Sequence, residues 1–436
     1  MPTALDPHAA VVTGATGATP VAPSGPLRTA DGRLLTRALS RSKGRARRRA
    51  FLLVLPLLVF VLLTFVVPIG QMLQRSAYNP AFSANMPEVS AWFAEHPGVA
   101  PDEAAYAALA ADIKASAEAR TIGAVGTRIN YDAPGTRSLF TATGRKARGD
   151  DWQPPFKETL IAADPKWGDP AIWGAMRGAA SAVTGNFYLA AVDRRRDAEG
   201  DIVRAPEGQQ IYITLFERTF WLSLTITALT FVLGFPIAHL LATLPTRKSN
   251  LLMILVLLPF WTSLLVRTTA WMVLLQQQGV INDILVWAHI ISDNQRLQMI
   301  YNQTGTIIAM THILLPFMIL PLYSVMRTIN PSYVRAARSL GATSWTAFRR
   351  VYFPQTLPGL GAGALLVFIL AVGYYITPAL VGGSSGQLIS NMIAMHMTST
   401  LNWSLAAALA SLLLAGVLIL YWLYDRLVGV DNLKLG

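Results

Sequence analysis

Long apolar stretches dominate the pattern of hydrophobic and polar positions along this chain of 436 residues. Each of six stretches is close to the length of about 20 residues that an α-helix needs to cross a bilayer. Tryptophan and tyrosine side chains flank several of them, as is typical of spans whose aromatic residues lie at the membrane interface. We therefore predict an all-α membrane protein with six transmembrane helices, at residues 51–72, 220–244, 251–275, 306–326, 360–380 and 405–424.

The composition supports a membrane protein, and the position of the charges predicts its orientation. Only 14% of the residues are charged, against roughly 25% in soluble domains. Basic residues concentrate in loops on the cytoplasmic side of membrane proteins. With the N-terminus inside, the inner segments carry 18 basic and 4 acidic residues, and the outer segments carry 17 basic and 20 acidic ones. The net charge of +12 therefore reflects topology, with both termini in the cytoplasm, and we expect no nucleic-acid partner.

The spacing of the spans predicts four parts of the chain. A long polar segment between the first two spans is expected to be a periplasmic, partly helical insertion, because it is too long for a simple loop. Apolar residues recur at helical spacing within 101–118, and Asp169-Pro170 predicts the start of another helix. The remainder of the insertion predicts turns, and we favour a scaffold role for it over a docking surface. The four parts are a disordered basic cytoplasmic tail at 1–47, a first helix at 48–73, the insertion at 74–216 and a five-helix core at 217–436.

The sequence contains no catalytic or metal-binding pattern that we recognise, and we predict that the chain is not an enzyme. It has no cysteine, no pair of histidines with the spacing of a zinc helix and no Walker A sequence. His239 and His312 fall within predicted spans, where hydrogen bonding to a neighbouring helix is favoured over proton handling. Two other classes of membrane protein are disfavoured. A membrane-anchored sensor would need a cytoplasmic reporting domain, which the predicted topology does not provide. An ion-coupled secondary carrier would be expected to have intramembrane carboxylates, which the predicted spans lack, and two related halves.

The loop at residues 327–358 is basic, without a single acidic residue, and its pattern predicts a helix, a turn and a second helix. Asn330-Pro331 supplies an N-cap and a first-turn proline for a helix that runs to about Leu340. Gly341 suits the left-handed position that ends such a helix.

The second predicted helix of this loop carries an aromatic stripe. Thr343 or Ser344 can cap it, and we expect it to stop near the prolines at 354 and 358. Its aromatic residues recur at i, i+3 and i+7 and therefore share one face. Docking of this face into a groove of a partner is favoured over contact with the inner leaflet. The three aromatic residues are Trp345, Phe348 and Tyr352.

At these positions the sequence resembles a known family. Arg335-Ala336-Ala337, Gly341 and Pro354 resemble, at the same spacing, the E-A-A, x3, G, x9, I-x-L-P loop of the membrane subunits of binding-protein-dependent ATP-binding-cassette importers. The loop also lies just before the penultimate span, as in that family. Arg335 stands where the family usually has glutamate, and Phe353 stands where it has leucine. The first departure reverses a charge, so an ion pair of the family's glutamate cannot be carried over.

The resemblance covers about residues 217–436 and the first helix, and it implies the type I importer permease fold and a mechanism of alternating access in a bacterial inner membrane. A periplasmic binding protein would deliver the solute, and two ATPase subunits, which hold ATP and Mg, would grip the 327–358 loop. The resemblance implies no cofactor in this chain and a second, homologous permease, which we expect to form a heterodimer with it. The expected ATPase-coupling residues are Arg335, Ala336, Ala337, Gly341, Trp345, Phe348, Tyr352 and Pro354.

Further sequence runs resemble the spermidine/putrescine branch of this family. They lie at residues 259–263, 267–271, 279–282 and 373–380. Branches for ferric ion, thiamine and opines carry related runs and stay as alternatives. No predicted span contains Asp or Glu, but aromatic side chains that can make cation-π contacts with a polyamine are present. We predict a polyamine as the solute and a translocation path or gate that includes Trp261, Arg267, Trp271, Tyr374 and Tyr375.

Arg267 is the one formal charge within the predicted spans. An arginine at membrane depth costs about 2.5 to 3.5 kcal/mol on insertion scales, so it should face protein or a water-filled cavity. A structural anchor and a gate residue both remain open for it. Its positive charge would repel a polyamine, which argues against direct contact with the substrate.

Overall fold

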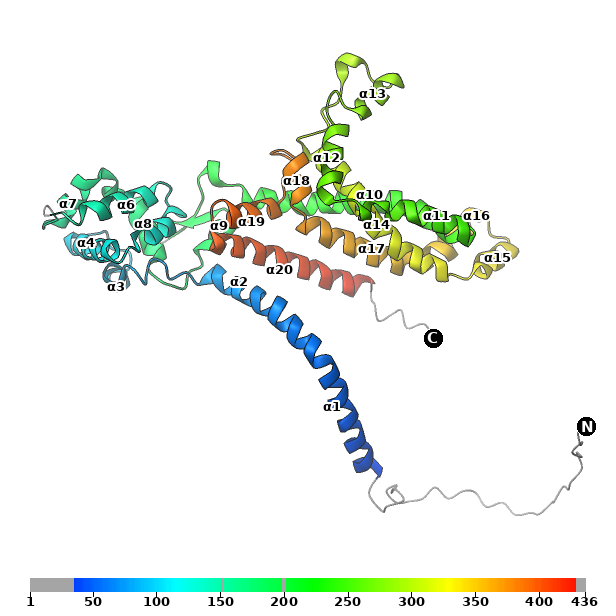
Figure 1. Cartoon of the computed structure of the whole chain (residues 1–436), viewed down its shortest axis with the longest axis horizontal. Helices are drawn as coiled ribbons and strands as arrows, with labels where there is room; N and C mark the ends of the chain where they lie inside the picture. Colours follow the sequence, from blue (N-terminus) through cyan, green and yellow to red (C-terminus); the bar gives the residue numbers. More distant parts are fainter. Residues whose placement is uncertain (1–34, 150–151, 198–200, 429–436) are drawn as a thin grey trace, which may run out of the picture. The chain divides into compact units, whose positions relative to one another are not determined.

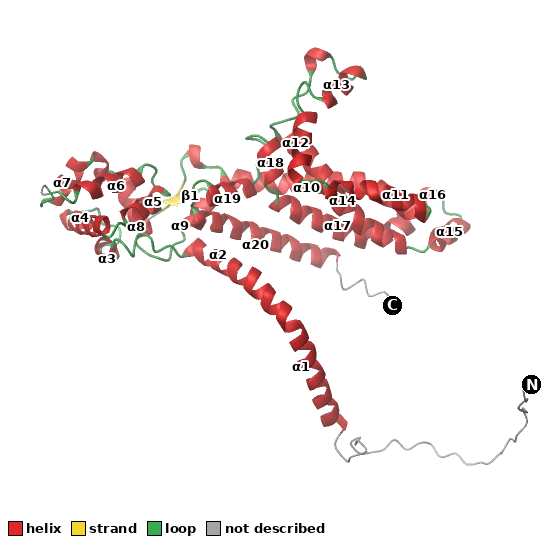
Figure 2. Ribbon diagram, viewed as in Figure 1, coloured by secondary structure: helices red, strands yellow, loops and turns green. Residues whose placement is uncertain are grey.

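The computed structural model describes residues 35–149, 152–197 and 201–428. The predicted tail lies outside these residues up to position 34. The chain divides into two units, residues 1–70 and 71–436. Within the described residues the secondary structure is helical except for one short antiparallel pair, β1 (Arg194–Arg196) and β2 (Ile202–Arg204) (Figure 2).

The first span consists of α1 (Leu35–Val61), a π-helical turn (Leu62–Val66) and α2 (Val67–Ala77), which follow one another without a break. The stretch Arg47–Ala77 is long and apolar enough to cross a membrane. Its apolar side chains are exposed, as expected of a helix in lipid. The tail was predicted to be disordered over residues 1–47. α1 begins at Leu35, so residues 35–47 are helical instead.

Among the described residues, five helices are long and apolar enough to span a membrane, or six if one bent pair counts as a span. The second, fourth and sixth predicted spans are α10 (Tyr212–Thr243), α14 (Gln303–Thr328) and α20 (Trp403–Val428). α10 and α14 pack against each other and against α17 (Phe353–Gly373), and these three helices form the centre of the bundle (Figure 1).

The third predicted span, residues 251–275, consists of two helices joined by a sharp bend, and it is a sixth span only if this bent pair is taken as one. α11 (Thr246–Leu257) and a 3₁₀ turn (Leu258–Trp261) are followed by α12 (Leu264–Leu274) at an angle of 97°. Thr262 and Ser263 between them have extended backbone. Pro259 has no amide hydrogen and limits the continuation of the helix. The apolar run continues through the bend, so hydropathy alone does not reveal it.

The fifth predicted span, residues 360–380, is shifted toward the N-terminus. α16 (Ser344–Ala347), a π-helical turn (Phe348–Tyr352) and α17 form one continuous helix that ends at Gly373. Tyr374 has extended backbone, and α18 (Ile376–Val381) follows as a separate short helix. The span therefore begins earlier than predicted and ends at Gly373, before the last third of the predicted stretch.

Glycines on α17 allow the bundle helices to approach closely. A Cβ atom added at Gly359 would lie 2.9 Å from the carbonyl oxygen of Pro321 on α14, and one at Gly363 would lie 2.9 Å from the sulfur of Met318. This agrees with the packing role that small residues have between membrane helices. The remaining helices of this region are α13 (Val280–Trp287), a 3₁₀ turn (Asp293–Gln295), α15 (Pro331–Ser339) and α19 (Ile389–Thr398).

The insertion contains a helical unit with its own apolar core, in which Trp167 and Phe140 are fully buried and their rings meet edge to face. Asp102 and Asp169 cap two of its helices, in the two stretches predicted to be helical. The prediction of turns holds at residues 131–135, but α3, α5, α6, α7 and α9 occupy much of the rest. Its elements are α3 (Pro87–Glu95), α4 (Glu103–Glu118), α5 (Ile122–Asn130), α6 (Thr136–Lys146), α7 (Phe156–Ala163), a 3₁₀ turn (Pro165–Gly168), α8 (Pro170–Ala179), α9 (Asn186–Ala191), β1, β2 and a 3₁₀ turn (Glu207–Gln209).

Asp193 joins the insertion to the bundle. It is buried, has a left-handed backbone conformation and precedes β1. Its carboxylate accepts hydrogen bonds of 2.8 to 3.0 Å from the backbone N–H groups of residues 211–213. These groups belong to the start of α10, where no preceding helical turn supplies acceptors. The negative charge also interacts favourably with the positive end of the helix dipole.

Asp112 makes a similar contact inside the insertion. From α4, its carboxylate accepts hydrogen bonds from the N–H groups of Val89 (2.9 Å) and Glu88 (3.3 Å) at the start of α3. Met86, the N-cap residue of α3, provides no side-chain acceptor. Burial raises the pKa of Asp112 from 3.8 to about 6, although the two N–H donors oppose the rise.

We predict that the packing of α3 on α4 loses stability relative to the unfolded state as pH rises through about 6, because the buried carboxyl of Asp112 must then ionise. A carboxyl group whose pKa is raised in the folded state binds its proton more tightly there than in the unfolded state. Its stabilising contribution is full below pH 3.8 and is lost above about 6, by roughly 2 to 3 kcal/mol. Asp112→Asn keeps an acceptor oxygen but cannot titrate. Hydrogen exchange of residues 87–118 in the full chain, corrected for intrinsic rates, should lose most of its pH dependence in this variant.

Asp102→Asn is the matched control, since Asp102 is an exposed carboxylate that caps α4, the helix that carries Asp112. It should retain the pH dependence of the unmodified chain. An Asp112→Asn variant with the unmodified pH dependence would contradict the assignment.

Candidate functional site

The 327–358 loop begins with α15, whose two ends have the predicted caps. The Asn330 side chain accepts a hydrogen bond from the N–H of Ser332 (2.9 Å), and Pro331 occupies the first turn. At the other end Gly341 has φ +89°. The N–H of Ala342 bonds to the carbonyl of Ala337 (3.1 Å), and that of Gly341 bonds to the carbonyl of Arg338 (3.0 Å). These two bonds form a Schellman motif, which ends the helix at a left-handed residue.

The second helix of the loop starts as predicted but does not stop at Pro354. Thr343 accepts a hydrogen bond from the N–H of Thr346 (3.2 Å) and caps α16. The expected stop near the prolines was wrong, because the π-helical turn widens the backbone just before Pro354, and the N–H of Phe353 bonds to the carbonyl of Phe348. The 327–358 loop is therefore mechanically continuous with the membrane helix α17.

The aromatic residues stack along one face, but their exposure decreases toward the bundle. The ring centroids of Trp345 and Phe348 are 5.7 Å apart, and those of Phe348 and Tyr352 are 5.9 Å apart. Trp345 is 67% exposed, whereas Phe348 packs edge to face on Phe235 of α10. Tyr352 is only 9% exposed, so it belongs to the bundle core and cannot present its ring to a partner.

Tyr352 connects the 327–358 loop to α10 by a hydrogen bond. Its hydroxyl lies 3.0 Å from Nδ1 of His239, and the two rings meet edge to face. His312, the other histidine predicted to bond to a neighbouring helix, accepts a hydrogen bond at Nδ1 from the indole N–H of Trp271 (3.1 Å). Both contacts fit the hydrogen-bonding interpretation of these histidines.

The surface of α15 adds apolar residues that the sequence analysis missed. Leu340 is 89% exposed and Tyr333 is also exposed. They are seven residues apart and therefore lie near one face of the helix, which is the sequence signal that could have identified them. Arg335 and Ala336 are exposed on α15, and Ala337 is half-buried. The accessible part of the 327–358 loop is thus apolar and basic.

The predicted path residues lie at the two places where spans break. Arg267 and Trp271 are on α12, directly after the bend, and Tyr374 and Tyr375 lie between α17 and α18. α12 and α18 are in contact. Trp261 is exposed in the 3₁₀ turn before the bend, and none of the ring contacts or hydrogen bonds of the described residues joins it to the other four.

Side chains satisfy the backbone at the second break. The carbonyl of Tyr374 accepts a hydrogen bond from Ser390 Oγ, and that of Tyr375 accepts one from Asn391 Nδ2, each at 2.7 Å. The hydroxyls of Thr268 and Thr377 lie 3.2 Å apart and join α12 to α18. The two breaks are therefore parts of one hydrogen-bonded assembly.

Arg267 is half-buried beside this assembly. Its charge acts on both Tyr374 and His312. Its Nε atom is buried and has no hydrogen-bond partner among the described residues. An unpaired buried donor on a charged side chain is costly, so the guanidinium is suited to a carbonyl or anionic group that the described residues do not supply.

The fold and these two features define a helical permease domain. Residues 218–429 match the binding-protein-dependent transport system inner membrane component family. The "Spermidine/putrescine transport system permease protein PotB" of Escherichia coli (strain K12) is 33% identical over 222 residues, which cover 50% of this chain and 80% of that protein. The chain therefore belongs to this family: it is a multi-pass inner membrane permease subunit, and not an enzyme.

More distant relatives carry other names. The "Probable sulfate transport system permease protein cysT" of Marchantia polymorpha is 25% identical over 208 residues, which cover 47% of this chain and 70% of that protein. A crystal structure of a bacterial alginate ABC transporter, in complex with an alginate pentasaccharide-bound periplasmic protein, matches with 18% identity and a TM-score of 0.39, over 52% of this chain and 80% of that chain.

We predict that Gly341→Leu destabilises the end of α15 by about 1 to 2 kcal/mol, the cost of placing a side chain in the left-handed region. A Cβ atom at this position would meet nothing within 4 Å, so the cost is conformational and not steric. Hydrogen exchange of the amides of residues 341 and 342 should accelerate accordingly. Gly341→Asn is the matched control, because asparagine tolerates this conformation, and it should remain close to the unmodified chain. Equal protection in both variants would contradict the Schellman geometry.

Proposed function

We propose that this chain forms one half of the translocation path of a polyamine importer that works by ATP-driven alternating access. The observation that carries the proposal is the 33% identity to a spermidine/putrescine permease over 222 residues. The family match at residues 218–429 contains both the 327–358 loop and the broken spans. A periplasmic binding protein delivers the solute, and a second, homologous permease completes the path as a heterodimer. Two ATPase subunits, which bind ATP and Mg, act on the 327–358 loops.

In this proposal the termini and the 327–358 loop are cytoplasmic and the insertion at 74–216 is periplasmic. The support is the charge distribution, with 18 basic and 4 acidic residues on the inner side. The core at 217–436 carries the path. The insertion is a scaffold, which is supported by its own buried core and by the bond of Asp193 to the start of α10.

The 327–358 loop transmits ATPase movement to the membrane helices. Trp345, Leu340 and Tyr333 are its exposed apolar contacts, and no acidic residue accompanies them. Because Arg335 replaces the family's usual glutamate, the ATPase facing it is expected to carry an acidic residue at that contact. The continuous helix from Ser344 to Gly373 then carries the displacement into the bundle.

The path is expected to lie at the two breaks, where Trp261, Trp271, Tyr374 and Tyr375 offer aromatic rings for a cationic solute. Arg267 positions this assembly and does not contact the polyamine, because its charge would repel it. Selection among solutes takes place mainly in the binding protein. Ferric ion and thiamine remain alternative solutes of the same importer class.

An anionic solute, such as an opine, is the second candidate. The observation that favours it is the buried, unpartnered Nε of Arg267 near the breaks. A guanidinium in that position matches a carboxylate better than an ammonium group.

We predict that deletion of the gene abolishes high-affinity uptake of labelled spermidine and that the restored gene recovers it. Unlabelled putrescine should compete for uptake, because both solutes present the same ammonium chemistry. An opine, thiamine, sulfate and chelated ferric ion, each at the same excess, should not compete. Unchanged spermidine uptake, together with lost uptake of one of these other solutes, would assign the importer to that solute instead.

We also predict that Trp345→Ala lowers co-purification of the ATPase about tenfold or more. An exposed aromatic anchor that fills a partner's pocket often contributes about 2 kcal/mol, whereas its loss from a free surface has little effect on folding. Trp287→Ala is the matched control, since Trp287 is 80% exposed on α13, outside the loop. Thermal stability should be unchanged in both variants. Phe348→Ala should instead lower it, because Phe348 packs on Phe235.

If the ATPase is retained equally by the Trp345→Ala and Trp287→Ala variants, Trp345 is not a docking residue. The lipid-contact interpretation of this part of the loop would then hold.

A further inference from the structure

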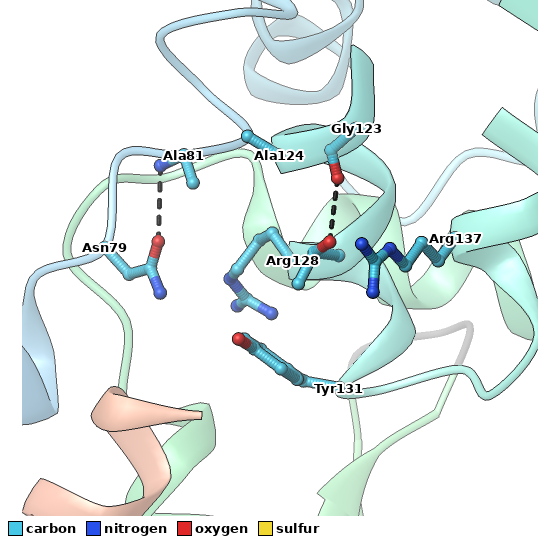
Figure 3. Close-up of a pocket in the computed structure, with 8 residues that line it drawn as sticks. Asn79, Ala81, Gly123, Ala124, Arg128, Tyr131 and Arg137 are labelled. Atoms are coloured by element: carbon cyan, nitrogen blue, oxygen red, sulfur yellow. Dashed lines mark hydrogen bonds between the residues drawn. The ribbon is translucent and has the colours of Figure 1, made fainter. Parts of the chain in front are cut away.

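A pocket of about 400 Å³ lies on the insertion, outside the bundle and its broken spans. Figure 3 shows the side chain of Arg128 extending between Asn79 and Tyr131, with Arg137 beside them. Most of the lining comes from α5 and from Tyr131 directly after it, and the rest comes from Arg137 of α6 and the segment after α2. The lining residues are Asn79, Ala81, Gly123, Ala124, Thr127, Arg128, Tyr131 and Arg137.

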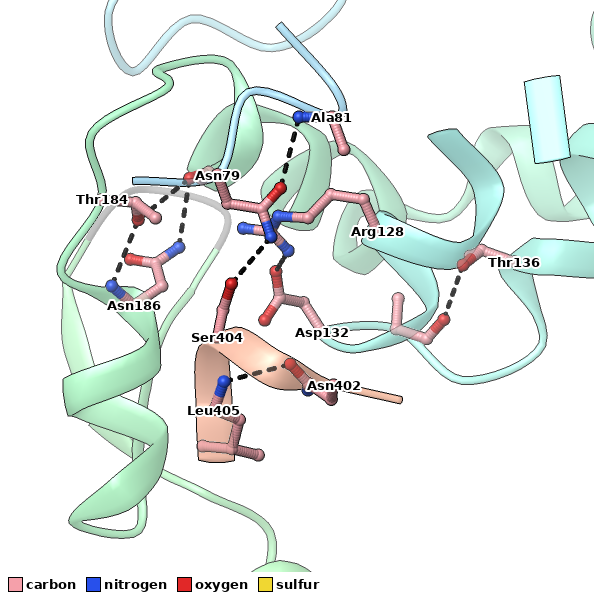
Figure 4. A network of polar contacts seen from close by, with 12 residues as sticks. Asn79, Ala81, Arg128, Asp132, Thr136, Thr184, Asn186, Asn402, Ser404 and Leu405 are labelled. Atoms are coloured by element: carbon pink, nitrogen blue, oxygen red, sulfur yellow. Dashed lines mark hydrogen bonds and ion pairs between the residues drawn. The ribbon is translucent and has the colours of Figure 1, made fainter. Parts of the chain in front are cut away.

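Arg128 is buried, and two of its three guanidinium nitrogens have no hydrogen-bond partner among the described residues. It is 1% exposed, and its guanidinium lies over the ring of Phe187, 4.7 Å from the ring centroid. Nη1 forms an ion pair with Asp132 at 2.6 Å (Figure 4). Nε and Nη2 have no hydrogen-bond partner among the described residues. These two atoms form one edge of the guanidinium, which is the fork that binds two oxygens of a carboxylate or phosphate.

The charge at the pocket is positive. Asp132 neutralises the charge of Arg128, while the exposed Arg137 has no ion-pair partner among the described residues. Both arginines act on the Tyr131 hydroxyl: burial raises the pKa of Tyr131, and the two positive charges oppose that rise. The Tyr131 hydroxyl therefore lies in the field of two guanidinium groups.

The pocket lies beside the ends of two membrane spans. Asn79 follows the last residue of α2 by two positions, and its Nδ2 donates to Ser404 Oγ of α20 (3.0 Å) (Figure 4). The Tyr131 hydroxyl donates to the carbonyl of Leu401 (3.0 Å), just before α20. Because the ends of spans mark the membrane interface, the pocket is at the level of lipid headgroups.

We propose that this pocket binds a phosphate group, either the headgroup phosphate of a lipid or free phosphate. The Nε and Nη2 edge of Arg128 holds two phosphate oxygens, and Arg137 at the rim neutralises the remaining charge. This places a buried donor edge against an acceptor and removes the cost of leaving it unpaired. The site is independent of the transported solute.

The test uses the purified full-length chain in an uncharged detergent. Thermal unfolding is followed during titration with inorganic phosphate, and chloride at equal ionic strength serves as the salt control. Arg128 is buried, so its replacement would also disturb folding, and the exposed Arg137 is the residue to change. Arg145→Gln is the matched control, because Arg145 is an exposed arginine on the same helix, α6, outside the pocket.

We expect phosphate to raise the unfolding temperature in a saturable manner that chloride does not reproduce. Arg137→Gln should raise the half-saturating concentration about tenfold, as for the loss of one charge-assisted hydrogen bond. Arg145→Gln should leave it unchanged. The absence of a saturable shift, or equal effects of the two variants, would overturn the proposal.

A parallel titration with a short-chain phosphatidylglycerol separates the two sources. If the lipid saturates the same Arg137-dependent shift at a concentration far below that of inorganic phosphate, the site holds a lipid headgroup. If inorganic phosphate acts alone and the lipid adds nothing, the site holds free phosphate. A lipid-induced shift that Arg137→Gln does not change is general lipid stabilisation and counts against the pocket.

Discussion

Where a membrane helix breaks, its freed backbone groups have no water to bond and must find partners within the protein. This constraint governs the part of the bundle in which the predicted path residues lie. The carbonyls of Tyr374 and Tyr375 are bonded by Ser390 and Asn391, and Thr268 meets Thr377 across the two breaks. Because these side chains satisfy the backbone, the apolar spans can be interrupted without exposing unpaired polar groups. The interruptions in turn place Arg267 near Tyr374.

The 327–358 loop and α17 act as one body for a related reason. Proline in a helix removes a donor and crowds the preceding turn, which normally ends or bends the helix. Here the wider π-helical turn before Pro354 accommodates the proline, and the helix runs from Ser344 to Gly373 without ending. π-Helical turns of this kind recur at functional sites. A force applied at Trp345 therefore reaches the middle of the bundle without an intervening hinge loop.

The features that the sequence revealed are local ones, and those that it concealed depend on distant residues. Asn330, Gly341 and Thr343 define the helix ends of the 327–358 loop, because capping chemistry acts over two to four residues. The bend after Trp261 could not be read from hydropathy, since both sides of it are equally apolar. The burial of Tyr352 follows from its contact with His239, which is 113 residues away. Asp112 and Asp193 likewise cap helices that do not contain them, so no local pattern identifies their role.

α10 is the element that two of these distant contacts, those of Asp193 and Tyr352, have in common. Asp193 of the insertion holds its first N–H groups, and Tyr352 of the π-helical turn bonds to His239 near its other end. Between these points α10 packs on both α14 and α17. A shift of α10 along its axis would have to break charge-assisted hydrogen bonds at one end or the Tyr352 bond at the other. Displacing α10 along its axis relative to the insertion or to the π-helical turn would therefore cost these hydrogen bonds.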